Sequence, residues 1–225
     1  MGRGREGPLR LCLRPQEARQ PVPLVHNPDY PIYIQFDFNV DPMCATVAQT
    51  DGKTWRRVLC EYRIENADTW TLCDRIKEEW WPDDDSNEEP PDVYICGDAS
   101  GRQRLSGVRG ALSQYHIIQK CLNVPWERFL IPKVNPFIVD SRVLMNTAMS
   151  RLDYLIDPSC EWLIHDLMFC RVKLNHKGEV DIQKTGKLVH AKMGAESMGH
   201  LMDTERYGMH MTLPRLVELI AEITS

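Results

Sequence analysis

Three segments with the alternating pattern of β-strands follow one another near the start of the chain, and their succession limits the fold more than any other feature. They cover residues 32–39, 44–49 and 55–64 and are rich in β-branched and aromatic side chains. A turn containing Asp51-Gly52, a pair typical of hairpins, separates the last two. Because consecutive strands with short connections tend to pair, the three segments predict an antiparallel meander.

Beyond the meander, segments with helical spacing alternate with short apolar segments. Residues 69–81 predict a helix, because Cys73, Ile76 and Trp80 recur at helical spacing and Asp68 can cap its start. Further helices are predicted at residues 108–122, 141–155, 195–210 and from 214 onward, further strands at 93–98 and 129–132, and a β-hairpin at 172–182, whereas residues 162–169 fit a strand or a helix. This order predicts an α/β protein with a mixed sheet, in which parallel strands join the antiparallel meander and helices flank the faces.

The length of the chain fits one domain. With 225 residues, 43% of them hydrophobic, it can bury one sizeable core. Residues 1–30 show little periodicity, so we expect a tail or linker there and one domain over residues 31–225. No apolar run approaches the roughly eighteen residues of a membrane-spanning helix, and the basic N-terminus lacks the apolar stretch of a secretory signal.

The formal net charge of −5 is unfavourable for a protein that binds nucleic acid. Six of the negative charges lie in one short stretch, at Asp83, Asp84, Asp85, Glu88, Glu89 and Asp92. Removing these six from the total leaves +1 for the rest of the chain. The charge therefore weakens a DNA-binding interpretation without excluding it.

The eight cysteines indicate a reduced protein. No two of them form a Cys-x-x-Cys pair, which argues against a zinc ribbon or finger. Most lie among apolar neighbours, as Cys96 and Cys170 do, so we expect free thiols that pack as small apolar side chains.

Three aspartates lie where a metal-dependent nuclease needs them. Two-metal hydrolysis of a phosphodiester bond requires carboxylates that converge from different elements, and Mg²⁺ prefers such oxygen ligands. Asp37 lies within the first predicted strand, Asp98 ends the strand at 93–98, and Asp203 lies within the last helix but one. Each has a structural alternative: an ion pair for Asp37, a turn or helix cap for Asp98, and an exposed position for Asp203. The combination of strand, strand and late helix is more specific than any member.

The local sequences around these aspartates carry a family resemblance. Asp37 is followed by Asp41-Pro42, Asp98 ends the apolar segment Tyr94-Ile95-Cys96-Gly97, and Asp203 lies in His200-Leu201-Met202-Asp203-Thr204-Glu205-Arg206-Tyr207. These segments resemble the C-terminal nuclease domain of tailed-phage large terminase subunits, in the RNase H-like superfamily, where the late-helix pattern is similar to His-x-x-Asp-x-x-Arg-Tyr. The resemblance covers roughly residues 30–212.

The resemblance implies an RNase H-like mixed sheet with an added hairpin beside the active site, and an endonuclease that cuts concatemeric double-stranded viral DNA during genome packaging. It implies that Asp37, Asp98 and Asp203 are catalytic and hold two Mg²⁺ or Mn²⁺ ions. Asp41 is a candidate fourth ligand, with a turn-forming role as its alternative. His200 shares a helix face with Asp203, and we expect it to pack rather than to support a ligand.

The resemblance also implies partners. These are a terminase ATPase domain, a small terminase subunit and a portal protein, in the cytoplasm of the infected bacterial host. The chain has no Gly-x-x-x-x-Gly-Lys-Ser/Thr phosphate loop, so it resembles the nuclease part alone.

Basic residues in two segments are candidates for contacts with DNA phosphates. Arg102, Arg104 and Arg109 follow Asp98, and Lys177 and Lys187 lie in the hairpin and after it. We expect the two groups to flank the duplex, with an ordinary solvated surface as the alternative. The six tryptophans are expected in the core rather than as platforms for bases.

Two other functions stay open. A junction resolvase or transposase-type nuclease would use the same fold, because a fold does not fix a reaction. A non-catalytic docking module of the packaging motor is the second, and aspartate at all three positions argues against it.

Overall fold

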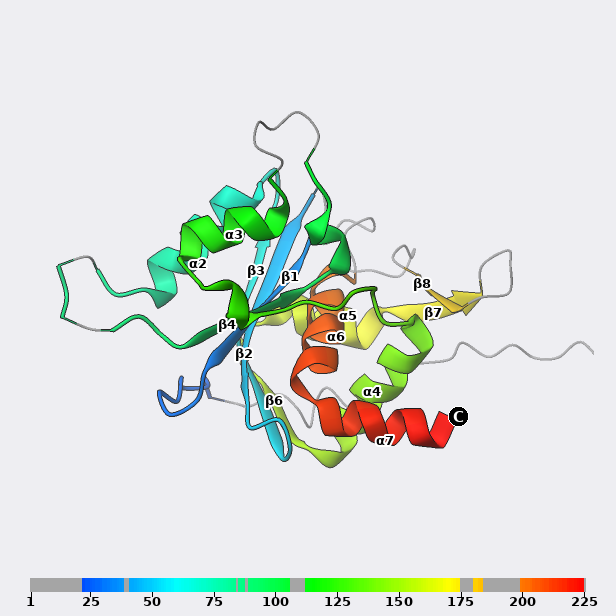
Figure 1. The fold of residues 1–225 in the computed structure, drawn as a ribbon. Helices are drawn as coiled ribbons and strands as arrows, with labels where there is room; N and C mark the ends of the chain where they lie inside the picture. The colour runs from blue at the N-terminus through cyan, green and yellow to red at the C-terminus, as the bar shows by residue number, and fades with distance from the viewer. Residues whose placement is uncertain are drawn as a thin grey trace, which may run out of the picture.

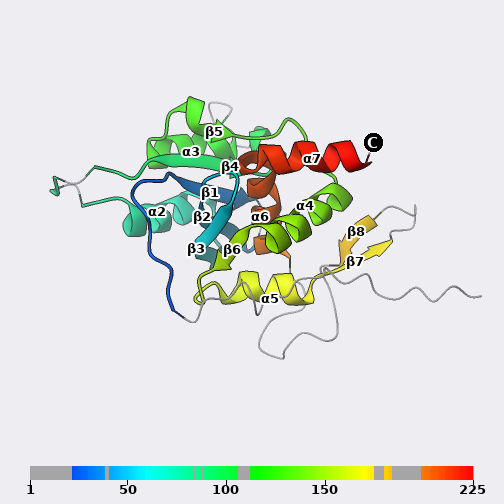
Figure 2. The same cartoon turned by 90° about the horizontal axis from the view of Figure 1, so that it is seen from below.

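A computed structural model describes residues 22–38, 41–83, 85–87, 89–105, 112–174, 180–183 and 199–224. Its centre is a mixed sheet with helices on both faces (Figures 1 and 2). In chain order the strands of this sheet are β1 (Ile32–Asp37), β2 (Met43–Thr50), β3 (Trp55–Ile64), β4 (Val93–Gly97), β5 (Phe129–Leu130) and β6 (Asp153–Ile156). The helices are α2 (Thr69–Trp80), α3 (Gln114–Leu122), α4 (Ile138–Arg151), α5 (Glu161–Phe169), α6 (His200–Thr212) and α7 (Pro214–Thr224), with two short 3₁₀ turns, η1 (Ala99–Arg102) and η2 (Trp126–Arg128).

The order of the strands is β5-β4-β1-β2-β3-β6. β1, β2 and β3 form the predicted antiparallel meander. β4 lies parallel to β1, β5 parallel to β4, and β6 parallel to β3. The predicted α/β fold with a mixed sheet is thus confirmed, and the predicted hairpin is present as the separate antiparallel pair β7 (Arg171–Leu174) and β8 (Val180–Gln183).

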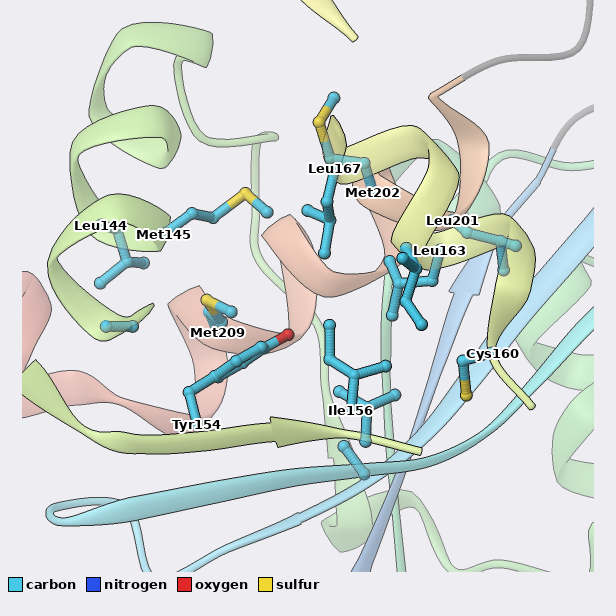
Figure 3. Close-up of a cluster of buried hydrophobic side chains, with 14 of the residues drawn as sticks. Leu144, Met145, Tyr154, Ile156, Cys160, Leu163, Leu167, Leu201, Met202 and Met209 are labelled. Atoms are coloured by element: carbon cyan, nitrogen blue, oxygen red, sulfur yellow. The ribbon is translucent and has the colours of Figure 1, made fainter. Parts of the chain in front are cut away.

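The sheet separates two apolar cores. Successive side chains of a strand point to opposite faces, so Ile34 and Phe36 of β1 pack under α2 and α3, while Gln35 and Asp37 face α6. The second core lies between the sheet and α4 to α7, and Figure 3 shows Leu163, Met209 and their neighbours filling it. Among the described cysteines none forms a disulfide, as the sequence predicts.

Several predicted boundaries are wrong or incomplete. The helix predicted to reach residue 155 ends at Arg151, because the next residues form β6 and pair with β3. The undecided segment 162–169 is the helix α5. The predicted starts of α3 and α6, at residues 108 and 195, fall outside the described part of the chain, within which these helices begin at Gln114 and His200.

Residues before β1 lie against the domain. The Leu24 N–H donates a hydrogen bond to the Asp157 carboxylate at 2.6 Å. Gln49 of β2 accepts from the Asn27 N–H at 2.9 Å and donates to the Asn27 and Tyr30 carbonyls. In the described part of the chain no helix has both the length and the apolar character needed to traverse a bilayer.

Two carboxylates cap the starts of α5 and α6. Glu61 of β3 accepts hydrogen bonds from the backbone N–H groups of Trp162 and Leu163, at 2.9 and 2.7 Å, at the start of α5. Asp166 of α5 accepts from the N–H groups of Leu201 and Met202, at 3.1 and 3.4 Å, at the start of α6. The N-terminal N–H groups of a helix have no partner within the helix and attract negative charge, so each contact anchors one element to the next.

The Glu61 cap predicts a pH dependence of stability. Burial raises the pKa of Glu61 to about 7 against the opposing backbone hydrogen bonds, compared with about 4.3 for free glutamate. Because the folded protein then holds the proton more tightly, this stability is present below pH 4.3 or so and is lost as the pH rises through about 7. The free energy of unfolding, measured by urea titration, should fall across this window by at most about 1.4 kcal/mol per pH unit for this group.

The matched variant is Glu61→Gln, which keeps an oxygen acceptor but does not titrate. Its unfolding free energy should depend less steeply on pH. A residual slope is expected from Asp166, because burial raises its pKa to about 6. Equal slopes for the parent and Glu61→Gln would contradict the assignment.

Candidate active site

Asp37 and Asp98 lie at the carboxyl ends of two adjacent parallel strands. Phe36 of β1 pairs with Gly97 of β4, and the Asp98 N–H donates to the Phe36 carbonyl at 3.1 Å. Gly97 has a φ of 152°, and a Cβ there would lie 2.5 Å from the Phe36 oxygen. The glycine therefore permits the close approach that brings the two aspartates together at the carboxyl ends of β1 and β4.

The Asp98 carboxylate is held on one side. Its Oδ1 accepts hydrogen bonds from the Ser100 N–H and from Asn135 Nδ2, both at 2.7 Å. The side-chain oxygen of Asn135 also accepts the Ala99 N–H at 2.8 Å, so the Asn135 amide contacts both Asp98 and the first residue of η1. Asp98 thus does cap η1, the structural alternative for this residue, but in the described part of the chain its Oδ2 has no hydrogen-bond partner.

α6 brings Asp203 to the same region. The exposed position considered for Asp203 is wrong, because the residue is 3% exposed. His200, one turn earlier, places its Nδ1 3.2 Å from Oδ2 of Asp37. His200 is buried, as the packing interpretation requires, but it also contacts the Asp37 carboxylate, which that interpretation did not include.

Arg206 fixes the orientation of Asp203. Its Nε donates to Asp203 Oδ1 at 3.0 Å, and its other nitrogens donate to the Pro136 carbonyl and the Tyr207 hydroxyl. The ion pair lies within α6, and the hydrogen bond from Arg206 to Pro136 joins the helix to the segment between β5 and α4.

Tyr207 lies within the electrostatic reach of all three aspartates. Burial raises the pKa of its hydroxyl, and the charges of Asp203, Asp37 and Asp98 raise it further against the opposing charge of Arg206. Asp37 and Asp98 lie at the ends of adjacent strands and His200 joins α6 to Asp37, so the three carboxylates, far apart in sequence, lie in one region. As they stand, no three acidic, His or Cys side chains of the described residues lie close enough to form a metal centre.

A buried ionic network fixes α6 on the sheet. Arg56 of β3 and Glu205 of α6 are fully buried, with Arg56 Nε 3.0 Å from Glu205 Oε2. Gln35 of β1 accepts from Arg56 at 2.7 Å and donates to Glu205 at 2.8 Å. Thr46 of β2 and Tyr154 of β6 also donate to Glu205. Four strands thus hold the residue two positions after Asp203.

Gly208 makes room for this network. A Cβ at position 208 would lie 1.1 Å from Oε1 of Gln35, so only glycine allows the helix to approach β1 so closely. The sequence contains this glycine within a predicted helix, and a glycine in that setting can signal a close contact. The network partners themselves, Arg56 and Gln35, were not predicted.

The remaining candidates are only partly described. The Asp41 carboxylate accepts the N–H of Asn66, 25 positions away, at 2.9 Å. Arg102, the last residue of η1, and Arg104, which follows it, are exposed. Arg109, Lys177 and Lys187 lie outside the described residues.

Solved structures of large terminases resemble this chain. The large terminase of the thermophilic bacteriophage D6E aligns with a TM-score of 0.60 and 13% identity, over 90% of this chain and 43% of that protein. The large terminase nuclease from thermophilic phage G20c with bound magnesium aligns with a TM-score of 0.58 and 13% identity, over 89% of this chain and 96% of that one. For the P22 large terminase nuclease domain the TM-score is 0.57 at 11% identity, over 92% and 96%.

This chain spans less than half of the length of the D6E protein and nearly all of the two nuclease domains. No protein-family model matches the sequence, and no curated protein matches it either. The sequence identities are too low to carry more than the fold. At that level the resemblance stated above is confirmed: the chain has the RNase H-like fold of large terminase nuclease domains.

Proposed function

We propose that this protein is a metal-dependent endonuclease that cuts double-stranded viral DNA during genome packaging, with Asp37, Asp98 and Asp203 as its metal ligands. One observation carries the proposal. Asp37 and Asp98 lie at the carboxyl ends of adjacent parallel strands, and the helix that carries Asp203 contacts Asp37 through His200. Strand ends and a helix face on a rigid sheet suit such a site.

The donor set fits divalent magnesium or manganese. Carboxylate oxygens are the ligands these ions prefer, and Asp98 offers an oxygen without another partner among the described residues. Two bound ions would activate a water and stabilise the leaving oxygen. The chain's own residues set the geometry: His200 orients Asp37, Arg206 orients Asp203, and Asn135 orients Asp98.

The comparisons support this function at the level of fold. The similar G20c nuclease has been solved with magnesium and with cobalt. By this likeness we assign the chain to the nuclease part of a large terminase, acting with an ATPase domain, a small terminase subunit and a portal protein in the cytoplasm of the bacterial host. The boundary near residue 31 and a fourth ligand at Asp41 belong to the same proposal.

The proposal predicts metal-dependent cleavage. The protein should linearise or degrade plasmid DNA in Mg²⁺ or Mn²⁺ and lose this activity in excess EDTA. Gel electrophoresis of supercoiled, linear and branched DNA separates the alternatives. A strong preference for branched DNA would favour a junction resolvase, and no cleavage together with no Mn²⁺ binding by calorimetry would favour a docking module.

Arg102 and Arg104 predict a salt dependence of DNA binding. If each contacts one phosphate, the double variant Arg102→Ala/Arg104→Ala should lower the slope of log affinity against log salt by about 2, because each contact releases about one counterion. Fluorescence anisotropy in EDTA measures this slope without cleavage. Arg75→Ala on α2, whose side chain is 62% exposed, is the control and should leave the slope unchanged. An unchanged slope in the double variant would remove the η1 segment from the interface.

A further inference from the structure

A small cavity lies between the start of α3, β5 and the η1 turn that follows Asp98. Its volume is about 260 Å³, and its lining includes Arg102, Tyr115, His116, Trp126, Phe129 and Ile131. Two of these residues connect it to Asp98. The Tyr115 hydroxyl donates to the Asp98 carbonyl at 2.7 Å, and Arg102 ends the short η1 turn that begins directly after Asp98.

The lining is aromatic and carries one cation. Trp126 is 45% exposed and Trp70 is 42% exposed, so the expectation that the tryptophans lie in the core is wrong for these two. The Trp126 ring lies 4.6 Å from that of Phe129 and 5.1 Å from that of His116, measured between centroids. These neighbours hold the indole in place while nearly half of its surface stays open. A planar ligand can therefore stack on it without further ordering of the side chain.

Arg102 supplies the charge. One of its nitrogens donates to the Ile131 carbonyl at 2.7 Å, which holds the guanidinium at the cavity while the residue remains exposed. A fixed guanidinium presents further N–H donors that match the oxygens of a phosphate. The cavity thus offers a stacking surface and an anion-binding group side by side.

The size limits the ligand. Pockets for drug-sized molecules measure roughly 300–1,000 Å³, and this cavity is smaller. It suits one aromatic ring system rather than a peptide or a duplex. Aromatic side chains combined with a cationic group are the common means of binding unstacked bases.

We propose that this cavity binds one unpaired nucleobase of the DNA strand that lies at the three aspartates, with Trp126 stacking on the base and Arg102 binding the adjoining phosphate. The inference rests on the proposed function for the identity of the strand, and it adds that the substrate is opened locally near the cut. A base within a strand is favoured over a free nucleotide because the cavity is joined to Asp98 through Tyr115.

The test compares a short duplex that contains one unpaired nucleotide with the same duplex fully paired. Fluorescence anisotropy in EDTA gives both affinities for the parent protein and for Trp126→Ala, Trp126→Phe and Trp70→Ala. Trp70 on α2 is 42% exposed and does not line the cavity, so its variant is the matched control. A 5-bromouracil at the unpaired position, irradiated and mapped by mass spectrometry, identifies the side chain in contact.

The parent and Trp70→Ala should prefer the duplex with the unpaired nucleotide by on the order of tenfold. Trp126→Ala should lose this preference, Trp126→Phe should keep most of it, and the crosslink should fall on Trp126 or His116. Equal affinities for both duplexes in the parent, or an undiminished preference in Trp126→Ala, would overturn the inference. Competition by deoxyadenosine monophosphate as strong as that of the DNA would also overturn it, by assigning the cavity to free nucleotides.

Asp203→Asn separates this inference from the nuclease proposal. The variant should retain the preference for an unpaired nucleotide whether or not the parent cleaves DNA. A preference that depends on Trp126 in a protein without cleavage would support the cavity and remove the nuclease function. Cleavage of DNA by a protein without a preference for the unpaired nucleotide would support the nuclease function and overturn the inference about the cavity.

Discussion

Replacement of Asp203 with asparagine is expected to lower the rate of metal-dependent DNA cleavage by on the order of 10³-fold. A bound divalent ion contributes several kcal/mol of transition-state stabilisation, and each 1.36 kcal/mol or so corresponds to a tenfold change in rate. Asparagine has nearly the same size and keeps an oxygen acceptor for Arg206 Nε, which lies 3.0 Å from Asp203 Oδ1. The fold should therefore survive while the negative charge is lost. Plasmid cleavage in Mn²⁺ and thermal unfolding, measured on one preparation, separate the two effects.

Two further variants sharpen this result. Asp153→Asn changes an exposed aspartate on β6, an edge strand that β2 and β3 separate from β1, and should leave cleavage unchanged. His200→Ala removes a group that orients Asp37 rather than a ligand, and a loss of about 10–100-fold is expected, as for other residues that support metal ligands. Full cleavage by Asp203→Asn would show that the helix does not supply a ligand.

Replacement of Glu205 with alanine is expected to cost about 3–5 kcal/mol of unfolding free energy, because it leaves Arg56 as a fully buried charge without its partner. Gln35 and Thr46 lose an acceptor at the same time. For a domain of this size, 1 kcal/mol corresponds to roughly 2–4 °C in melting temperature. The melting temperature, followed by circular dichroism, should therefore fall by about 10 °C. Cleavage should fall as well, since the network holds the helix that carries Asp203.

The control is an ion pair at the surface. Glu78→Ala removes the partner of Arg75 on α2, where both side chains are more than half exposed, and should cost no more than about 1 kcal/mol. A similar small loss of unfolding free energy in Glu205→Ala would contradict the view that the Arg56–Glu205 pair anchors α6.

Local patterns predicted most of the sheet. The meander, α2 and β4 follow from side-chain alternation, helical spacing and turn residues, and all three are present. The strand β6 was missed because Asp153–Ile156 is short and follows α4 with no glycine or proline to separate them. The segment 162–169 stayed open because a short apolar run fits both a buried strand and a buried helix.

The support around the aspartates was harder to predict. Asp37, Asp98 and Asp203 could be selected from sequence because strand ends and family motifs mark them. The contacts of Asn135 with Asp98 and of Arg56 with Glu205 join residues 37 and 149 positions apart. No spacing rule relates such residues, because only the tertiary packing of the sheet and α6 brings them together.

The two helix caps described above belong to a series of contacts that leaves the sheet and returns to it. β3 holds α5 through Glu61, α5 holds α6 through Asp166, and α6 returns to β1 through the contact of His200 with Asp37. Since these contacts start and end in one sheet, a displacement of α5 should also shift α6 and the contact of His200 with Asp37. A substitution that loosens α5 should thus disturb the arrangement of the three aspartates even when all three are intact.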